Sequence, residues 1–335
     1  MKAFEIRGNF GVDSLRLVER PIPSPGPGQV ILKMKAFSIN YRDLLVVDGV
    51  GRWKPPPGRV PLSDGVGIVA TTGSGVSRVK VGDRVAPIFY PKWMEGRVVA
   101  EKMPNALGGA TADGVLAEYT LFDEVSVVHV PAHLSDEEAA TLPCAGVTAW
   151  SAVLRFVPIA QGDSVVVLGT GGVSIFALQF STLLGPRVIV TSSSDQKLER
   201  AKELGAAAVI NYKTMRNWPK AVMELTGGIG ANYVVDTVGD LKQSIAAVRL
   251  GGTVAFVGLL VGMSAEIDLM TFMGKSARLE AVDVGSREMF KAMNKAIEFH
   301  AMRPAIDRVF GFTELPEALS YLREARHFGK VCLRA

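Results

Sequence analysis

A glycine-rich turn in the middle of the chain has the residue types needed to bind a phosphate. Residues 164–168 (SVVVL) indicate a buried strand, and the apolar stretch after 174 indicates a buried helix. The turn between them reads G-x-G-x-x-S. The first glycine permits the tight turn, the second lets the backbone approach a pyrophosphate, and a serine is small enough for the third, helix-packing position. Free N–H groups at the helix start would hold a dinucleotide pyrophosphate, although such a turn can also join two core elements without any ligand. The residues predicted to bind it are Gly169, Thr170, Gly171, Gly172 and Val173.

The end of the next predicted strand, 187–191, bears on which dinucleotide binds. NAD sites place an acidic side chain at this tip to hold the ribose 2′-hydroxyl. Here Ser192 and Ser193 stand at the tip, Lys197 follows within a helical turn, and Tyr212 ends the strand after that. Hydroxyl donors and a cation favour the 2′-phosphate of NADP. The competing acid is Asp195, which we interpret as the N-cap of a helix over 196–204.

The chain has two parts with different sequence patterns. Its 335 residues, at roughly 150 residues per domain, also suggest about two domains. Before residue 145, short strands such as 1–6, 29–39, 67–72 and 84–89 alternate with turns and predict an antiparallel β module of the barrel kind. From 145 to 285 strands alternate with helices and predict an α/β, doubly wound parallel sheet. Its six strands are predicted at 164–168, 187–191, 208–210, 232–236, 253–258 and 277–284. A helix over 287–299 and a short tail then return to the first module, and 91–113 is predicted to be a surface loop.

Composition excludes several classes of protein. Lys and Arg number 37 and Asp and Glu 33, so the net charge of +4 argues against nucleic-acid binding through phosphate neutralisation. Two cysteines cannot build a disulfide framework or a four-cysteine zinc lobe. The uncharged stretch 164–186 is long enough to cross a bilayer, but its glycines divide it after five residues, so we expect no membrane span. With no apolar signal segment at the N-terminus, the expected location is cytoplasmic.

The chain resembles the medium-chain dehydrogenase/reductase superfamily, which includes the zinc-type alcohol dehydrogenases, and is most similar to its zinc-free NADPH:quinone oxidoreductase-like branch. The resemblance covers essentially the whole chain. It rests on the proline-rich connector 21–28 and on the stretches 40–43 (NYRD), 65–69 (GVGIV), 81–85 (VGDRV), 142–150 (LPCAGVTAW), 169–174 (GTGGVS), 204–206 (LGA) and 211–212 (NY). It implies a GroES-like β-barrel catalytic domain (1–144 and 286–335) and a Rossmann NADP-binding domain (145–285), with the active site in the cleft.

The resemblance also implies roles for single residues. In NADP-using members of the branch, the positions of Lys197 and Tyr212 bind the 2′-phosphate. Val238, Gly258 and Leu259, which follow later strands, are expected to border the cofactor. From the tail, Lys330, or Arg326 near it, is expected to reach the cofactor.

A catalytic zinc is not expected. The zinc enzymes of the superfamily use Cys, His and Cys, and the matching positions here are Asn40, Ser63 and Cys144. One thiol with an amide and a hydroxyl is a poor tetrahedral zinc site, even if Asp64 were added. Cys144 is then interpreted as a small buried residue, with a reactive thiol as the alternative.

Without a metal, the chain favours hydride transfer from NADPH to an acceptor that carries its own electron sink, a quinone or an α,β-unsaturated carbonyl. The developing oxyanion needs a hydrogen-bond donor, for which the candidates are Asn40, Tyr41, a cofactor ribose hydroxyl or water. Asp43 and Thr148 complete the predicted catalytic set, although Asn40 and Asp43 could equally cap a turn and form an ion pair. Four aromatic side chains have two possible roles, as the wall of a substrate pocket or as part of the core. They are Trp53, Phe89, Tyr90 and Trp93.

Two other functions stay open at this point. One is an NAD(P)-dependent alcohol dehydrogenase of small alcohols or aldehydes, and the other is a non-enzymatic cofactor-binding or RNA-binding relative, which the lack of basic tracts disfavours. The expected partner is a small-molecule substrate. The last strand of the parallel sheet is an apolar edge that predicts a homodimer, as does the resemblance.

Overall fold

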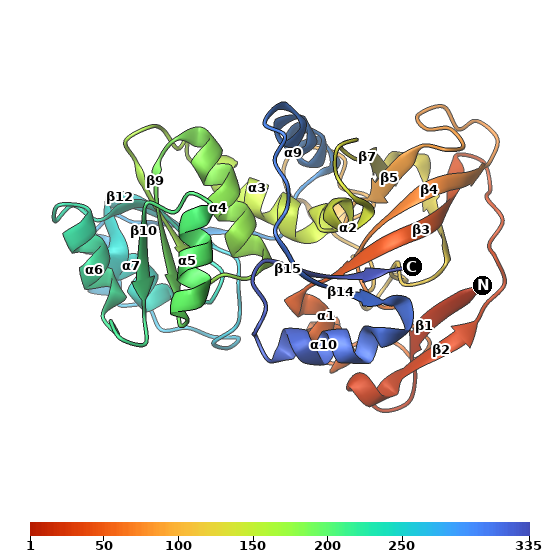
Figure 1. Cartoon of the computed structure of the whole chain (residues 1–335), viewed down its shortest axis with the longest axis horizontal. Coiled ribbons are helices and arrows are strands. Elements are labelled where there is room, and N and C mark those ends of the chain that lie inside the picture. The colour runs from red at the N-terminus through yellow and green to blue at the C-terminus, as the bar shows by residue number, and fades with distance from the viewer. The chain divides into compact units, whose positions relative to one another are not determined.

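The computed structural model describes all residues, 1–335, and the chain forms two compact units. Unit 1 comprises Met1–Val147 and Gly285–Ala335, and unit 2 comprises Thr148–Val284. The sequence places the divisions after residues 144 and 285. Each unit has its own sheet system and is described by itself (Figure 1).

Unit 1 is built on β3, which runs over Gln29–Ile39 as predicted. On one edge β3 pairs antiparallel with β4, and on the other with β6 at one end and β15 at the other. The main sheet has the order β14-β15-β3-β4-β5-β7, and β1 and β2 form a separate pair. Only β14 and β15 are parallel, so the predicted antiparallel β module is confirmed. The strands of unit 1 are β1 (Lys2–Ile6), β2 (Leu15–Glu19), β3, β4 (Asp64–Thr72), β5 (Arg84–Pro87), β6 (Tyr119–Asp123), β7 (Val127–His129), β14 (Ile306–Gly311) and β15 (Lys330–Arg334).

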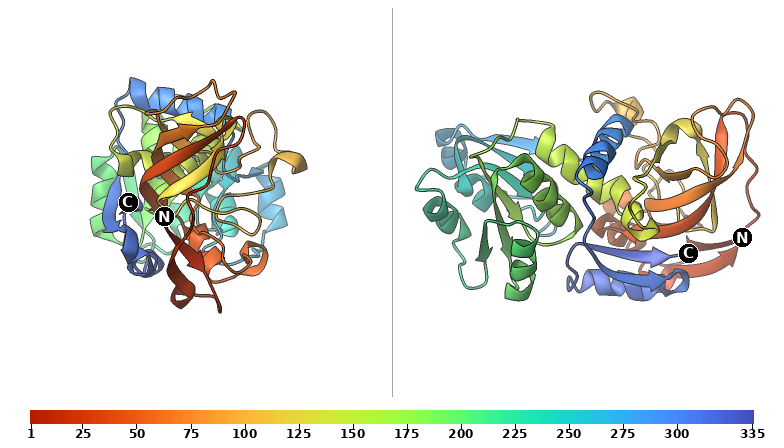
Figure 2. Two further views of the ribbon diagram at one scale, coloured as in Figure 1. Left: turned by 90° about the vertical axis from the view of Figure 1, so that its right-hand side faces the viewer. Right: turned by 45° about the horizontal axis from the view of Figure 1, so that its top comes forward.

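Chain segments far apart in sequence share the core of unit 1. Val30, Leu32 and Met34 are buried on β3, and Leu315 and Leu319 of α10 belong to the same apolar cluster. Figure 2 shows the C-terminal strands, in blue, beside the red and orange N-terminal strands. The helices of unit 1 are α1 (Tyr41–Val47), α2 (Asp136–Ala140), α9 (Arg287–Phe299) and α10 (Leu315–Arg323), with a π-helical turn at Leu142–Gly146. The tail therefore completes a sheet that the N-terminal third begins.

Unit 2 is a six-stranded parallel sheet of order β10-β9-β8-β11-β12-β13. The order reverses between β8 and β11, which confirms the doubly wound prediction and puts ligand-binding loops at the carboxyl ends of these strands. Helices flank this sheet (Figure 1). The elements are α3 (Val147–Leu154), β8 (Ser164–Leu168), α4 (Gly172–Leu184), β9 (Arg187–Ser192), α5 (Asp195–Glu203), β10 (Ala208–Asn211), α6 (Trp218–Leu225), β11 (Ala231–Asp236), α7 (Leu241–Ala247), β12 (Val248–Phe256), α8 (Leu269–Gly274) and β13 (Arg278–Ala281).

The long uncharged stretch 164–186 is divided between β8 and α4. None of the helices has the length and apolar character that a bilayer crossing needs. Both elements lie against the other strands of unit 2, so their apolar residues are core residues.

The structure corrects one helix boundary. Ser194, not Asp195, is the N-cap of α5, and its hydroxyl accepts a hydrogen bond of 3.4 Å from the backbone N–H of Lys197. Asp195 is the first helical residue, where an acid is also stabilised by the helix dipole. As predicted, a glycine ends this helix, and Gly205 has a φ of 101°.

The segment 91–113 contains little regular structure, as predicted, apart from a short 3₁₀ turn at Ala100–Lys102. It is not wholly a surface loop, however, because Trp93 and Leu107 are buried. The rings of Phe89 and Tyr90 lie edge to face at 4.7 Å, and Tyr90 also contacts Trp93. These three aromatic side chains are thus core residues, and Trp53 packs against the unit 1 core.

Candidate functional site

The glycine turn of unit 2 presents open backbone donors. Gly169 has a φ of 77°, and its N–H donates to Thr191 O at 2.9 Å, which fixes the turn to the neighbouring strand. Gly171 is the N-cap of α4 and has no side chain to cap the first helical turn. The first N–H groups of a helix lack partners within the helix, so this arrangement fits an anionic ligand such as a pyrophosphate.

Ser174 does more than fill the small position of the turn. Its hydroxyl donates to Leu168 O at 2.8 Å and lies 3.0 Å from the hydroxyl of Thr237, which donates to the same carbonyl at 2.6 Å. These bonds join the end of β8, the start of α4 and the segment after β11. The sequence singled out Ser174 only for its size, and it did not single out Thr237.

The predicted 2′-phosphate residues gather at one corner of unit 2. Ser192 ends β9, and its carbonyl accepts a 3.1 Å hydrogen bond from Tyr212 N–H, which brings the segments after β9 and β10 together. Ser193 follows β9, Lys197 lies in the first turn of α5, and the Tyr212 side chain is exposed. Asp195, the only acid at this corner that the sequence identified, accepts a hydrogen bond of 2.7 Å from Asn211 Nδ2.

Asp236, at the end of β11, shapes the loops beside the turn. Its carboxylate is buried and accepts from the N–H groups of Val238 (2.9 Å) and Gly239 (2.7 Å) and from Ser244 Oγ (2.8 Å). Burial raises its pKa, against these hydrogen bonds. The sequence analysis missed this residue. An acid at the end of an otherwise apolar strand is the signal that could have identified it.

Gly258 has a strict steric reason to be glycine. A Cβ at this position would lie 1.6 Å from the carbonyl oxygen of Thr237. Gly258 and Leu259 follow β12, and Val238 follows β11, so all three lie at the carboxyl-end edge of the parallel sheet, where the glycine turn also lies.

Unit 1 holds a cluster of buried polar groups around the start of α1. Asn40 precedes α1, and its backbone N–H donates to Asp43 Oδ2 at 2.8 Å. Asp43 also forms an ion pair of 3.1 Å with Arg42. Burial raises the pKa of Asp43, although Arg42 opposes this shift. The capping and ion-pair interpretation of Asp43 therefore describes its contacts.

Asp64, the first residue of β4, is the second buried acid of this cluster. It accepts from Ser63 Oγ at 2.8 Å and from the backbone N–H of Cys144 at 3.2 Å. Burial raises its pKa to about 6, while the charge of Lys330 and the amide of Asn40 act in the opposite direction. Burial also raises the pKa of the Cys144 thiol well above its ordinary value, which favours the small-residue interpretation over a reactive thiol.

Lys330 joins this cluster from the tail. It is buried, and its ammonium donates to Ile39 O at 2.8 Å and to Asn40 Oδ1 at 2.5 Å. Tyr41 is exposed beside the cluster, whereas Thr148 is a buried residue of unit 2. The structure thus brings Asn40, Asp43, Asp64 and Lys330 together, but not all of the residues predicted to be catalytic.

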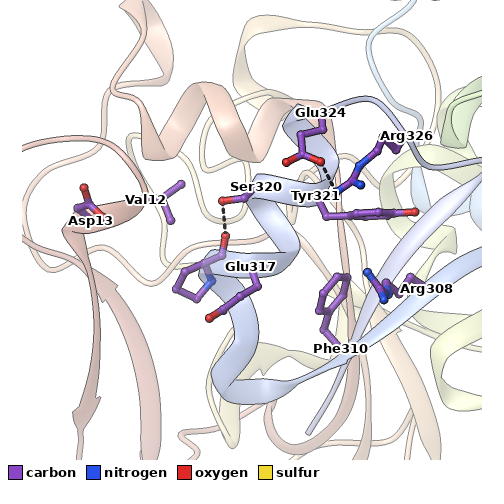
Figure 3. Close-up of a pocket in the computed structure, with 10 residues that line it drawn as sticks. Val12, Asp13, Arg308, Phe310, Glu317, Ser320, Tyr321, Glu324 and Arg326 are labelled. Carbon is purple, nitrogen blue, oxygen red and sulfur yellow. Dashed lines mark hydrogen bonds and ion pairs between the residues drawn. The ribbon is translucent and has the colours of Figure 1, made fainter.

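A surface hollow of about 460 Å³ lies elsewhere in unit 1, along α10. Figure 3 shows Tyr321 in this hollow with Arg308 and Arg326, whose guanidinium groups lie 5.2 and 5.3 Å from its ring centre. Of the residues singled out from the sequence, only Arg326 lines it, and Arg326 forms an ion pair with Glu324. The hollow therefore adds nothing to the polar cluster or the glycine turn.

Both units match known families. Residues 26–132 match the alcohol dehydrogenase GroES-like domain, and residues 172–298 match the zinc-binding dehydrogenase domain. The zinc-type alcohol dehydrogenase-like protein C1773.06c of Schizosaccharomyces pombe is 39% identical over 97% of this chain and 96% of its own length. The chain belongs to the medium-chain dehydrogenase/reductase superfamily and is an oxidoreductase.

Solved structures agree with this assignment. A structure described as an NAD-dependent alcohol dehydrogenase is 33% identical, with a TM-score of 0.90 and full coverage of both chains. The mycobacterial protein Rv1454c, solved with NADPH, is 27% identical, with a TM-score of 0.82 and full coverage of both chains. The relatives thus include proteins described with either nicotinamide cofactor.

The donor set in unit 1 does not fit the zinc site of the superfamily. The oxygen of Asn40 is bonded to the Lys330 ammonium, Ser63 Oγ donates to Asp64, and Cys144 is the one thiol of the set. An imidazole is missing from this set, and a resident cation adds repulsion for a divalent ion. No group of three or more His, Cys, Asp or Glu side chains is placed to hold a metal ion.

Proposed function

We propose that this protein is a zinc-independent reductase that transfers hydride from NADPH to a quinone or an α,β-unsaturated carbonyl compound. The observation that carries the proposal is the chemistry of Asn40, Ser63 and Cys144, which does not fit the zinc of the alcohol dehydrogenases. Alcohol oxidation needs a Lewis acid or a strong general base for the alkoxide. A conjugated acceptor delocalises the incoming electron pair and needs only a hydrogen-bond donor.

NADPH is favoured over NADH by the corner that Ser192, Ser193, Lys197 and Tyr212 form. A 2′-phosphate there would meet hydroxyl groups and an ammonium, and charge-assisted hydrogen bonds of this kind are about twice as strong as neutral ones. Asp195 is the group that would repel it, and its carboxylate is bonded to Asn211. The NADPH complex of the mycobacterial relative supports the same choice.

Unit 2 would hold the cofactor through the open N–H groups of the glycine turn, with Val238, Gly258 and Leu259 on the neighbouring loops. Bound NADPH would supply the hydride. The contribution of the protein is to orient both reactants, which can account for several kcal/mol of the barrier. In unit 1, Asn40 is the best placed donor for the acceptor oxygen, because its Nδ2 makes no hydrogen bond within the protein.

The acceptor class is tested by following NADPH oxidation at 340 nm. Chelator-treated protein, with its metal content measured, is mixed with a quinone, a conjugated enone or a saturated ketone. We expect turnover with the quinone or the enone, none with the ketone, and no loss of rate after chelation. Stoichiometric zinc whose removal abolishes turnover would refute the proposal.

An alcohol dehydrogenase is the second candidate, favoured by the description of the 33% identical solved structure as an NAD-dependent alcohol dehydrogenase. Steady reduction of NAD or NADP by simple alcohols would establish it. Running the saturated-ketone reaction with NADH as well as NADPH separates the two candidates, since a saturated ketone is the reverse substrate of such an enzyme.

We also propose that the protein is a homodimer through the edge of the unit 2 sheet. β13 pairs only with β12, so its other edge is open. Beside it in sequence, α8 exposes Leu269, Met270 and Met273. Pairing two such edges would remove an aggregation hazard and cover apolar side chains.

A further inference from the structure

The ammonium of Lys330 is held inside unit 1 by protein oxygens. Only 3% of the residue is exposed, and Nζ donates to Ile39 O at 2.8 Å and to Asn40 Oδ1 at 2.5 Å. Burying a lysine is costly unless its charge is compensated. The compensation comes from these two oxygens and from the nearby carboxylates of Asp43 and Asp64, whose charged forms Lys330 favours.

This contact fixes which way the Asn40 amide faces. An ammonium has three donors and no acceptor, so it can bond only the oxygen of the amide. The bond therefore directs Oδ1 toward Lys330 and leaves the N–H2 group on the other side. Nδ2 is buried and has no partner at hydrogen-bond distance and angle. It faces the carboxylate of Asp64 closely enough to favour the ionised form of that acid, so Asp64 is the protein group nearest to taking up one of its two N–H bonds.

An unpaired N–H2 group inside a protein is unfavourable and calls for an explanation. Ser63, Asp64 and Cys144 surround the same cluster, and with Asn40 they occupy the positions that resemble a zinc-ligand set. The cation found there is Lys330, and its direct partner is Asn40. The amide is thus the group through which this cation can act on a substrate oxygen.

We propose that Lys330 is a positioning residue, which holds the Asn40 amide so that its N–H2 group donates to the oxygen of the acceptor. This inference rests on the proposed reductase function. It differs from the role expected from the sequence, in which Lys330 contacts the cofactor. In this proposal Lys330 orients the Asn40 amide, and the amide stabilises the developing oxyanion.

The decisive variant is Lys330→Met, which has a similar length but no donor. We expect kcat with the best acceptor to fall at least 10-fold, while the Kd for NADPH, measured by fluorescence titration, stays within twofold. A kcat within twofold of the parent would overturn the proposal. A 10-fold weaker NADPH affinity would also overturn it and would support a cofactor contact.

Lys275 provides a matched control. Its Nζ donates to two backbone carbonyls, Ala246 O and Val248 O, both at 2.6 Å, in unit 2. Lys275→Met and Lys330→Met should both destabilise the protein, but Lys275→Met should leave kcat unchanged. Equal losses of kcat in both variants would show that destabilisation, not positioning, causes the effect.

Asn40→Asp tests the donor itself and serves if Lys330→Met does not fold. The carboxylate can keep the contact with Lys330 as an ion pair, but it has no N–H2 group. Loss of one oxyanion donor costs about 10²–10³-fold in kcat. We expect a loss in this range with unchanged NADPH affinity, and retention of kcat would overturn the proposal.

One readout does not need turnover, so it separates a failure of this inference from a failure of the proposed function. The side-chain amide of Asn40 gives a ¹⁵N NMR signal that is identified by its loss in Asn40→Asp. We expect one sharp pair of amide proton signals in the parent and shifted or broadened signals in Lys330→Met, because the amide plane would then reorient about the Cβ–Cγ bond. Unchanged signals in Lys330→Met would contradict the positioning role whatever acceptor the enzyme uses.

Discussion

Asp195 accepts a hydrogen bond of 2.7 Å from the side-chain amide of Asn211. Asp195 begins α5, and Asn211 ends β10, so the bond joins the segments that follow two neighbouring parallel strands. The bond fixes the position of this carboxylate, which keeps its charge. Ser192, Ser193, Lys197 and Tyr212 complete the corner.

Replacing Lys197 with Met should weaken NADPH binding selectively. Removing one ammonium–phosphate contact costs about 1.5–3 kcal/mol, which is roughly a 10-fold or greater rise in Kd. Affinity for NADH should change by less than twofold, because NADH has no 2′-phosphate. Lys202→Met, on the same helix, is the control. Equal losses for both cofactors would contradict the assignment of Lys197.

Ser174→Ala should destabilise unit 2. The serine hydroxyl is buried and bonded to Leu168 O and to Thr237, so its loss should cost about 1–2 kcal/mol of unfolding free energy. Ser181 is the control, because its hydroxyl is buried on the same helix without a hydrogen-bond partner. Ser181→Ala should be neutral or stabilising in urea unfolding. A larger loss at Ser181 than at Ser174 would contradict these hydrogen-bond assignments.

These two serines show what a sequence can and cannot predict. The strand–turn–helix around Ser174 was predicted because its β-branched run, glycines and apolar stretch are all local signals. The partner of Ser174, Thr237, lies 63 residues further on, and no local pattern indicates it. For the same reason the contact between Lys330 and Asn40, which are 290 residues apart, had no signal in the sequence.

The predicted ends of helices and strands were wrong where two local sequence signals pointed to different residues. Ser194 and Asp195 are both good helix caps, and the sequence analysis chose Asp195 where the structure has Ser194. β12 begins at Val248, five residues before its predicted start, and so includes Gly251 and Gly252, residues with a high turn propensity. The strand passes through them instead, with a register shift against β11. Tertiary pairing thus overrode the turn propensity of two glycines.

Asp64 should make stability fall as pH rises. Its pKa is raised from 3.8 to about 6 in the folded state, so the folded chain binds more protons than the unfolded chain between these values. The stabilisation by protonated Asp64 is complete below about pH 4 and is lost as pH rises through about 6. At 1.36 kcal/mol per pK unit, the loss is about 3 kcal/mol.

Urea unfolding of the parent and of Asp64→Asn between pH 4 and 7 measures this effect. The amide does not titrate, so the difference in unfolding free energy between the two proteins should change across this window in favour of the variant. Parallel curves would show that the Asp64 carboxyl has its ordinary pKa.

The proposed dimer predicts a change of mass on disrupting α8. Met270 and Met273 are 80% and 71% exposed in the single chain, and the double substitution of both by Glu should convert dimers to monomers in light scattering. Phe299→Glu is the control, since Phe299 is 85% exposed but lies on α9 in unit 1. A monomeric parent, or a dimer that persists in the double variant, would contradict this interface.

Titration calorimetry of the parent with NADPH and with NADH tests the cofactor assignment, on which the proposed reaction depends, most directly. The arrangement of Ser192, Ser193, Lys197 and Tyr212 predicts that NADPH binds at least 10-fold more tightly, and that the difference shrinks at high salt as the phosphate contacts are screened. Equal affinities, or tighter binding of NADH, would contradict it.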